Sequence, residues 1–222
     1  VDINVDYNVN RGGSEGSNTI RKDYFLPSLN LKYNLNEKHS LRLGASKTYT
    51  LPQAKEISPY RYVGVNFNSQ GNPNLKPSDN YNFDLKWDFN PSPTELVSLT
   101  AFYKHIKEPI SRIEVASAGG YLSYENISDC AIVAGVEVEI RKNLFVRPLS
   151  SAANGMNKLS FGLNGSYIYT NAKMPLATVT TGSQLEGAAP WIANFDLSHH
   201  FTRDERSFVN TLVLNYVSDK IY

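Results

Sequence analysis

Residues 81–89 read Tyr81-Asn-Phe-Asp-Leu-Lys-Trp-Asp-Phe89, an alternation of apolar and polar side chains that never slips. Side chains of a β-strand point alternately to its two faces, so this segment has one apolar face and one polar face. Similar alternation returns at residues 1–9, 25–35, 41–49, 97–103, 132–140, 159–169, 191–201 and, more weakly, 208–216. The pattern predicts about nine strands.

The alternating stretches are long. They run for about 10–14 residues, whereas strands usually have about 5–6. Twelve residues at about 3.3 Å each, tilted by about 40°, cover roughly 30 Å, the thickness of a bilayer's hydrocarbon core. The polar face also carries mid-strand charges, such as Asp84, Lys86 and Asp88, which a dry core would penalise. The fold class predicted is all-β, an antiparallel transmembrane β-barrel. A soluble sheet with one wet face is the alternative.

Composition is consistent with this class. Aromatic residues make up 12% of the 222 residues, as expected where aromatic girdles mark two membrane interfaces. No apolar run of about 18 residues predicts a membrane helix, and no signal peptide is recognisable at Val1. The formal net charge of +1 gives no reason to expect nucleic-acid binding. The single cysteine, Cys130, excludes an internal disulfide.

The connections alternate between long and short. Long polar loops are expected at residues 10–23, 51–78, 107–129 and 171–189, and tight turns at 34–39, 90–94 and 202–206. Outer-membrane barrels have long extracellular loops and short periplasmic turns, which assigns the two sides. The connection at residues 143–157 falls on the turn side yet is long, and its Pro148 and Asn154-Gly155 predict a flexible excursion.

A sheet in lipid cannot leave an open edge, and single-chain bacterial barrels use even strand numbers. About nine strands therefore indicate one section of a larger barrel. No linker divides residues 1–222, so one continuous domain is expected.

Two stretches carry a resemblance to a known family. Residues 71–78 read Gly-Asn-Pro-Asn-Leu-Lys-Pro-Ser and are followed by a strand, a turn and a second strand that runs into Ile106-Lys-Glu-Pro-Ile110. Residues 135–140 read Gly-Val-Glu-Val-Glu-Ile. Over roughly residues 25–222 the chain resembles the barrel of TonB-dependent outer-membrane receptors, in which a G-N-P-x-L-K-P-E-type element closes a long extracellular loop. Ser78 stands where the family often has Glu, and no plug domain, energy-coupling box or barrel-terminating aromatic strand is recognisable.

The resemblance implies active import through a 22-stranded barrel in the cell outer membrane. The implied cargo is a small nutrient such as a metal chelate, a cobalamin, haem or an oligosaccharide. The implied partners are outer-membrane lipid and lipopolysaccharide, the TonB complex acting through a plug domain, and in some cases a surface lipoprotein. Two other functions stay open: a passive or adhesive outer-membrane barrel, and a soluble β-sheet binding protein.

The ligand is expected at the loop tips and the upper lumen. The 51–78 loop offers stacking and hydrogen-bonding groups, and the predicted ligand-binding residues are Tyr60, Arg61, Tyr62, Phe67 and Asn68. The alternative is that these aromatic residues only pack the loop against its neighbours.

Nothing in the sequence predicts an enzyme, a metal site or a cofactor. His199 and His200 are adjacent on a predicted strand, so their rings point to opposite faces and cannot chelate one ion together. Glu137 and Glu139 lie on the polar face, where Arg141 continues the row, which suggests a charge ladder rather than a catalytic pair.

Lys47 lies on the apolar parity of its strand, near the loop side. A charge at mid-bilayer costs about 2–4 kcal/mol, and this cost falls toward zero at the interface. Lys47 is therefore predicted at headgroup level, beside a lipopolysaccharide phosphate or simply snorkelling.

Overall fold

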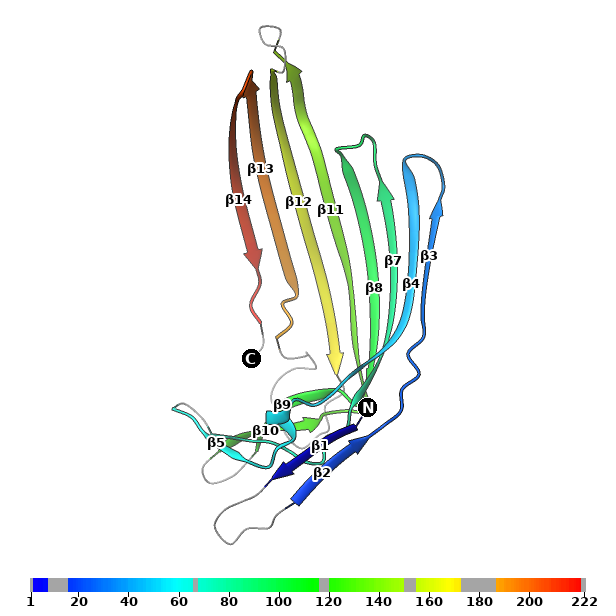
Figure 1. Cartoon of the computed structure of the whole chain (residues 1–222), viewed down its shortest axis with the longest axis vertical. Coiled ribbons are helices and arrows are strands. Elements are labelled where there is room, and N and C mark those ends of the chain that lie inside the picture. Colours follow the sequence, from blue (N-terminus) through cyan, green and yellow to red (C-terminus); the bar gives the residue numbers. More distant parts are fainter. Residues whose placement is uncertain are drawn as a thin grey trace.

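The computed structural model describes residues 2–7, 16–65, 68–115, 120–149, 155–172 and 187–220. Its main feature is a sheet of eight antiparallel strands in the order β14-β13-β12-β11-β8-β7-β4-β3 (Figure 1). The bounds of these strands are β3 Ser28–Asn34, β4 His39–Thr50, β7 Ser78–Phe89, β8 Leu96–Lys107, β11 Cys130–Pro148, β12 Met156–Ala172, β13 Trp191–Arg203 and β14 Arg206–Val217.

The register keeps the two faces of the sheet distinct. Leu85 of β7 pairs with Leu43 of β4 on one side and Ala101 of β8 on the other, which extends the apolar face across three strands. The next residue on the opposite face, Lys86, pairs with Arg42 and Thr100. We refer to these two surfaces as the apolar face and the polar face.

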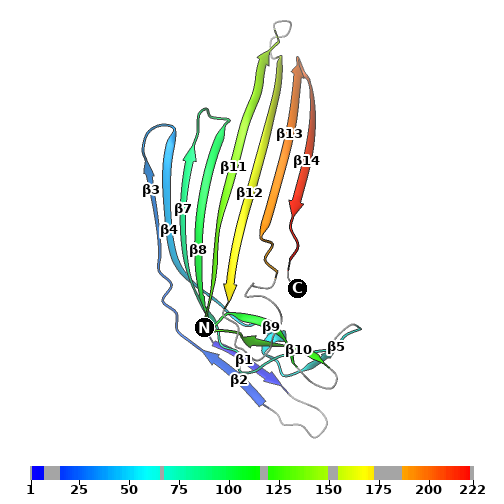
Figure 2. The same cartoon turned by 180° about the vertical axis from the view of Figure 1, so that it is seen from behind.

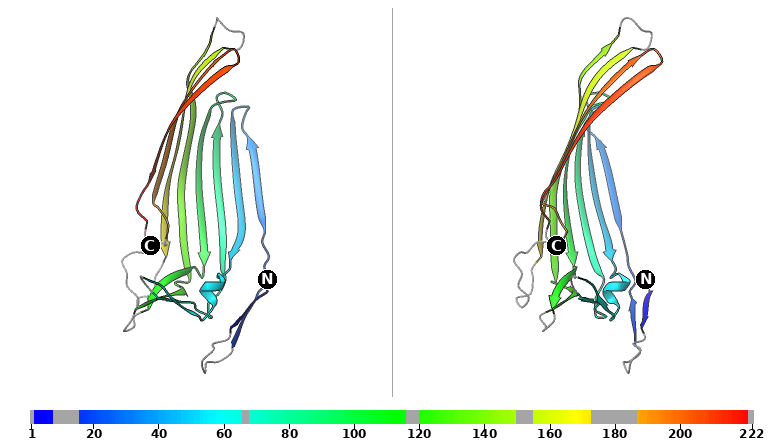
Figure 3. Two further views of the ribbon diagram at one scale, coloured as in Figure 1. Left: turned by 60° about the vertical axis from the view of Figure 1, so that its left-hand side comes forward. Right: turned by 90° about the vertical axis from the view of Figure 1, so that its left-hand side faces the viewer.

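Nothing in the described part of the chain covers the apolar face. Phe83 is 50% exposed and Leu85 is 51% exposed, and every residue of β3 and β14 is exposed. The strands form a single curved layer, seen from behind in Figure 2 and from the side in Figure 3. A soluble sheet would bury its apolar face against a second layer. The exposed face is instead suited to lipid, as the alternation predicts.

The sheet is also open. Its edges are β3 and β14, and the described residues show no pairing between them. Open edges cannot face hydrocarbon, because their backbone N–H and C=O groups would lack partners. The chain therefore has the architecture of a partial barrel.

The count of long strands differs from the expected nine. The first alternating stretch does form a strand, β1 (Asp2–Tyr7), but β1 pairs with β2 (Gly16–Arg21) in a separate two-stranded sheet. Alternation reveals that a segment is extended with two unlike faces, and it does not reveal which neighbour the strand pairs with.

The two ends of the sheet are unlike. At the turn end, short connections join β3 to β4, β7 to β8 and β13 to β14. At the loop end, the segments expected to be loops contain short elements: α1 (Ala54–Ile57), β5 (Arg61–Val63), β6 (Asn68–Gln70), β9 (Ile110–Val115) and β10 (Tyr121–Asn126). The four strands form a second sheet in the order β5-β6-β10-β9 (Figure 1). We call this sheet with α1 the cap.

The expected excursion at residues 143–157 is wrong in extent. Strand pairing between β11 and β12 continues until Pro148 faces Met156, so the connection covers only residues 149–155. The register shifts between Asn143 and Phe145, which places a bulge at Leu144. One inserted residue reverses the parity of all residues that follow, so the alternation is interrupted in the sequence although the strand continues.

Among the described residues no helix is long and apolar enough to cross a bilayer, since α1 has four residues.

Candidate ligand-binding site

The motif at residues 71–78 joins the cap to the large sheet. A Cβ added to Gly71 would lie 2.7 Å from the carbonyl oxygen of Lys55 and 2.9 Å from that of Glu56, so only glycine fits against α1. The backbone N–H of Asn72 donates to the Glu56 carbonyl at 2.6 Å, and its side-chain amide donates to the Tyr124 carbonyl at 2.9 Å. The start of the motif thus ties α1 to β10.

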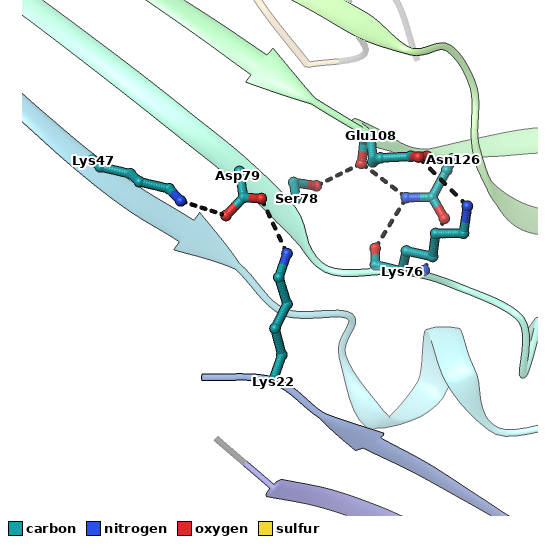
Figure 4. A network of polar contacts seen from close by, with 7 residues as sticks. All are labelled: Lys22, Lys47, Lys76, Ser78, Asp79, Glu108 and Asn126. Carbon is teal, nitrogen blue, oxygen red and sulfur yellow. Dashed lines mark hydrogen bonds and ion pairs between the residues drawn. The ribbon is translucent and has the colours of Figure 1, made fainter. Parts of the chain in front are cut away.

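The end of the motif is held by Asn126. The Asn126 amide donates to the carbonyls of Lys76 (3.0 Å) and Glu108 (2.8 Å), and its side-chain oxygen accepts from the Lys76 N–H (2.9 Å). The Ser78 hydroxyl donates to the same Glu108 carbonyl at 2.7 Å (Figure 4). Glu108 has a φ of 51°, an uncommon value for a non-glycine residue, at the turn where the chain leaves β8 and enters β9. These bonds fix the direction in which β9 enters the cap.

A cleft of about 620 Å³ lies between the cap and the loop end of the large sheet. Its volume is within the range usual for ligand pockets, about 300–1,000 Å³. Its lower wall is formed by polar-face residues at the loop end of the large sheet, among them Thr50 of β4 and Ser78 and Asn80 of β7. The Asn80 amide donates to the Thr50 hydroxyl at 3.0 Å, and Asn80 is buried. The cleft therefore opens on the face that a barrel turns toward its lumen.

The upper wall comes from the cap and supplies charge. It includes Lys55 and Glu56 of α1, Arg112 of β9 and Tyr124 of β10. The Glu56 carboxylate already accepts the backbone N–H of Gln53 at 2.8 Å, as part of the N-terminal cap of α1. Two cationic side chains, one carboxylate and several hydrogen-bonding groups favour a ligand with anionic and polar groups.

The predicted ligand-binding residues lie elsewhere in the cap. Arg61 and Tyr62 are in β5 and Asn68 is in β6, while Tyr60 precedes β5 and Phe67 lies outside the described residues. The Arg61 guanidinium lies 5.6 Å from the centre of the Tyr121 ring. None of the four described residues lines the cleft.

Sequence reasoning missed the cleft residues for different reasons. Thr50, Ser78 and Asn80 could have been found, because their parity places them on the polar face at the loop end. Arg112 and Tyr124 could not, because residues 107–129 carry no strand pattern that distinguishes them from a loop.

The described residues contain no group of three or more His, Cys, Asp or Glu side chains that could hold a metal ion. On the polar face, an Arg141 nitrogen lies 2.7 Å from a Glu139 carboxylate oxygen, a contact within β11, and the cross-strand partners of Glu139 are the uncharged Ser98 and Asn164. Arg42 and Lys86 lie 3.5 and 3.6 Å from the buried Asp88. Such a face is charged and internally paired, as a wet lumen wall requires.

Comparison with known proteins gives a consistent picture. Residues 1–220 match the family model described as TonB dependent receptor-like, beta-barrel. Over 91 residues the chain is 31% identical to the iron-regulated outer membrane virulence protein of Vibrio cholerae serotype O1, a stretch that is 40% of this chain and 14% of that protein.

The fold is similar to those of solved siderophore receptors. The siderophore receptor PirA of Pseudomonas aeruginosa matches 91% of this chain with a TM-score of 0.55 and 19% identity, and the match covers 35% of the PirA chain. A mutant of the ferric enterobactin receptor PfeA of the same organism, in complex with enterobactin, matches 89% of this chain with a TM-score of 0.55 and 20% identity, over 28% of its own length. At these identities the likeness concerns the fold, and the chain spans about a third or less of each solved receptor.

Proposed function

Because the chain belongs to the TonB dependent receptor-like beta-barrel family, we propose that it forms part of the wall of an outer-membrane receptor that imports a ferric siderophore. The observation that supports this function best is the cleft beneath the cap, which opens on the polar face of the sheet. In this orientation the loop end is extracellular and the turn end is periplasmic.

The charges of the cleft favour an iron chelate over a neutral cargo. Lys55 and Arg112 face the same space, and cations of this kind make strong charge-assisted hydrogen bonds to anionic oxygen atoms. A ferric siderophore with an anionic iron centre fits such a site better than a neutral oligosaccharide. The similarity to the siderophore receptor PirA, the ferric enterobactin receptor PfeA and the iron-regulated Vibrio protein supports the same class of cargo.

The proposal includes energy coupling. Transport would require a plug domain in the same receptor and the TonB complex, whereas a surface lipoprotein partner stays a prediction without support from the cleft. Uptake of ferric enterobactin that persists unchanged in cells lacking TonB would contradict energy coupling and favour a passive barrel.

The binding site is tested by two double variants of the intact receptor. Lys55→Gln with Arg112→Gln removes the positive charges of the cleft. Arg61→Ala with Tyr62→Ala removes two predicted ligand-binding side chains of β5, which we call the outer cap surface. We expect the first to weaken binding of ferric enterobactin by about tenfold or more, since a hydrogen bond to a charged group contributes about 1.5–3 kcal/mol.

Titration calorimetry with ferric enterobactin, haem, cobalamin and a neutral oligosaccharide distinguishes the outcomes. Weakening by the Arg61 and Tyr62 variant alone would move the site to the outer cap surface. Tight binding of only the neutral oligosaccharide by the unmodified receptor would contradict the proposed cargo.

A further inference from the structure

The apolar face carries a group of charges at its loop end, and the predicted headgroup-level residue Lys47 is one of them. Asp79 of β7, Lys47 of β4 and Lys107 of β8 all have the parity of Phe83 and the rest of the apolar face. Lys22, which precedes β3, reaches the same place (Figure 4). We call Lys22, Lys47 and Lys107 the outer lysine cluster.

The cluster is organised by one carboxylate and by tyrosine rings. The Lys22 Nζ lies 3.0 Å from Asp79 Oδ2 and the Lys47 Nζ lies 3.5 Å from Asp79 Oδ1. The ammonium groups of Lys47 and Lys107 lie 5.6 and 5.4 Å from the centre of the Tyr81 ring, so both flank one aromatic side chain. Cation–π contacts of this length are attractive.

Lys22 and a pair of tyrosines extend the cluster toward β3. The Lys22 Nζ lies 4.9 Å from the centre of the Tyr24 ring, and Tyr24 stacks on Tyr49 with centroids 4.2 Å apart. The hydrogen bond to Asp79 raises the pKa of Lys22, so this ammonium stays charged at neutral pH. The group holds three ammonium groups and one carboxylate, Asp79, which pairs with Lys22 and Lys47, so an excess of positive charge is left.

The position of the cluster limits what can bind it. One step down the same face lie Phe83 and Tyr103, which are 50% and 40% exposed, and beyond them lie Leu85 and Leu43. A ligand of this surface must therefore bring anionic oxygen atoms to the lysines and hydrocarbon to the side chains below. A phosphorylated lipid of the outer leaflet has both parts in that order.

The turn end of the same strands has a different composition. On β4 and β7 the apolar face ends there in His39, Trp87 and Phe89, whose rings stack, with His39 and Phe89 centroids 4.4 Å apart. The apolar face of β4, β7 and β8 carries lysine only at the loop end. The asymmetry matches a membrane whose two leaflets present different headgroups.

We propose that the outer lysine cluster binds a phosphate group of a phosphorylated lipid in the outer leaflet, with the acyl chains lying on the apolar face below. Tyrosine rings lie against the lysine ammonium groups, and Asp79 keeps Lys22 and Lys47 next to each other. This site depends on the location of the barrel in the outer membrane and not on the identity of the imported cargo.

The test uses the intact receptor in nanodiscs that contain lipid A or lipid A freed of phosphate. In a third arm, inorganic phosphate is added to the nanodiscs that contain lipid A. Native mass spectrometry measures the lipid retained. The Lys22→Gln, Lys47→Gln, Lys107→Gln variant is expected to retain lipid A at least about tenfold less well, since each lysine near an anionic lipid surface contributes about fivefold. Binding of ferric enterobactin by this variant is expected to be unchanged, which separates this site from the proposed cargo site.

The matched control is Lys104→Gln, because Lys104 lies on the polar face of β8, three residues from Lys107, and pairs with Asn82. It is expected to retain lipid A as the unmodified receptor does. The proposal would be overturned if the triple variant retained lipid A as well as the unmodified receptor does. It would also be overturned if the unmodified receptor retained phosphate-free lipid equally well. Displacement of lipid A by millimolar inorganic phosphate alone would show that the site binds a free anion and not a lipid. If the triple variant does not insert, Lys107→Gln, which removes no ion pair among the described residues, is expected to weaken retention by about fivefold.

Discussion

Ser78, Asp79 and Asn80 are consecutive residues of β7, yet they belong to two different surfaces. Ser78 and Asn80 line the cleft on the polar face, while the Asp79 carboxylate lies among lysines on the apolar face. The two polar sites are separated by the thickness of one strand. The alternation of one strand therefore places neighbouring polar residues on two different surfaces, while the cations of the cleft, Lys55 and Arg112, come from the cap.

The two surfaces differ in the side chains that follow them along the strands toward the turn end. Below the cleft, the polar face continues with charged pairs such as Arg42 and Asp88, so charge is tolerated along the whole strand. Below the outer lysine cluster, the apolar face of β4, β7 and β8 carries only uncharged side chains between Ala45 and Leu41, Phe83 and Phe89, and Tyr103 and Val97. The cost of a charged side chain should therefore depend on its depth in the membrane on the apolar face and not on the polar face.

The largest effect is expected from Leu85→Arg, which places a charge in the middle of the apolar face. Leu85 is 51% exposed, so the arginine fits sterically, and the loss of stability comes from placing its charge in hydrocarbon. We expect the free energy of unfolding in lipid vesicles to fall by about 2–4 kcal/mol. Denaturant titration followed by tryptophan fluorescence measures this change.

The matched variant on the other face is Asn164→Arg. Asn164 of β12 pairs with Glu139 of β11, so a new guanidinium would meet an anion in a wet lumen. We expect a change within about 0.5 kcal/mol, as for most surface substitutions. A loss as large as that of Leu85→Arg would show that both faces are dry and would break the comparison.

Much of this fold can be predicted from periodicity, because the physical signal is strong wherever one face meets lipid and the other water. The strand around Tyr81–Phe89 and its neighbours follow from alternation alone, and the exposed apolar face confirms what that alternation predicts. Alternation fails at Leu144, where a bulge changes the parity, and at β1, whose partner lies outside the large sheet.

The candidate site was harder to predict. Aromatic residues such as Tyr60 and Tyr62 attract attention in a sequence because they can stack on a ligand, but the cleft is built where the cap meets the polar face. The contact between the cap and the polar face depends on Gly71, Asn72 and Asn126, which contact the backbone of segments about 15 to 52 residues away. No local pattern encodes such contacts.

A smaller effect, confined to the polar-face site, is expected from Asn126→Ala. The change removes one exposed hydrogen bond to the Lys76 carbonyl and one half-buried hydrogen bond to the Glu108 carbonyl, and each loss costs about 0.5–1.5 kcal/mol. We expect faster hydrogen exchange in β9 and β10 and weaker binding of ferric enterobactin. Lipid A retention should not change, because the hydrogen bonds of the Asn126 side chain join Lys76 to Glu108, whereas Lys22 and Lys47 pair with Asp79.

The control for this variant is Asn194→Ala, which removes an exposed side-chain hydrogen bond of 3.5 Å to Asn164. It should leave exchange in the cap unaltered. If Asn126→Ala also left it unaltered, the network of Figure 4 would not be what holds the cap over the cleft.

The smallest change in stability, and the sharpest test of the outer surface, is expected from Asp79→Asn. Lys22 and Asp79 are 40% and 19% exposed at their side chains, so the ion pair is worth at most about 1 kcal/mol. An asparagine keeps an oxygen that can accept from Lys22 and removes the charge that competes with a phosphate. Native mass spectrometry should therefore show lipid A retained more tightly, by about fivefold, while the free energy of unfolding falls only slightly. Weaker retention would mean that the carboxylate's ordering of Lys22 and Lys47 outweighs its repulsion of the phosphate, because both lysines lose their shared anchor at the same time.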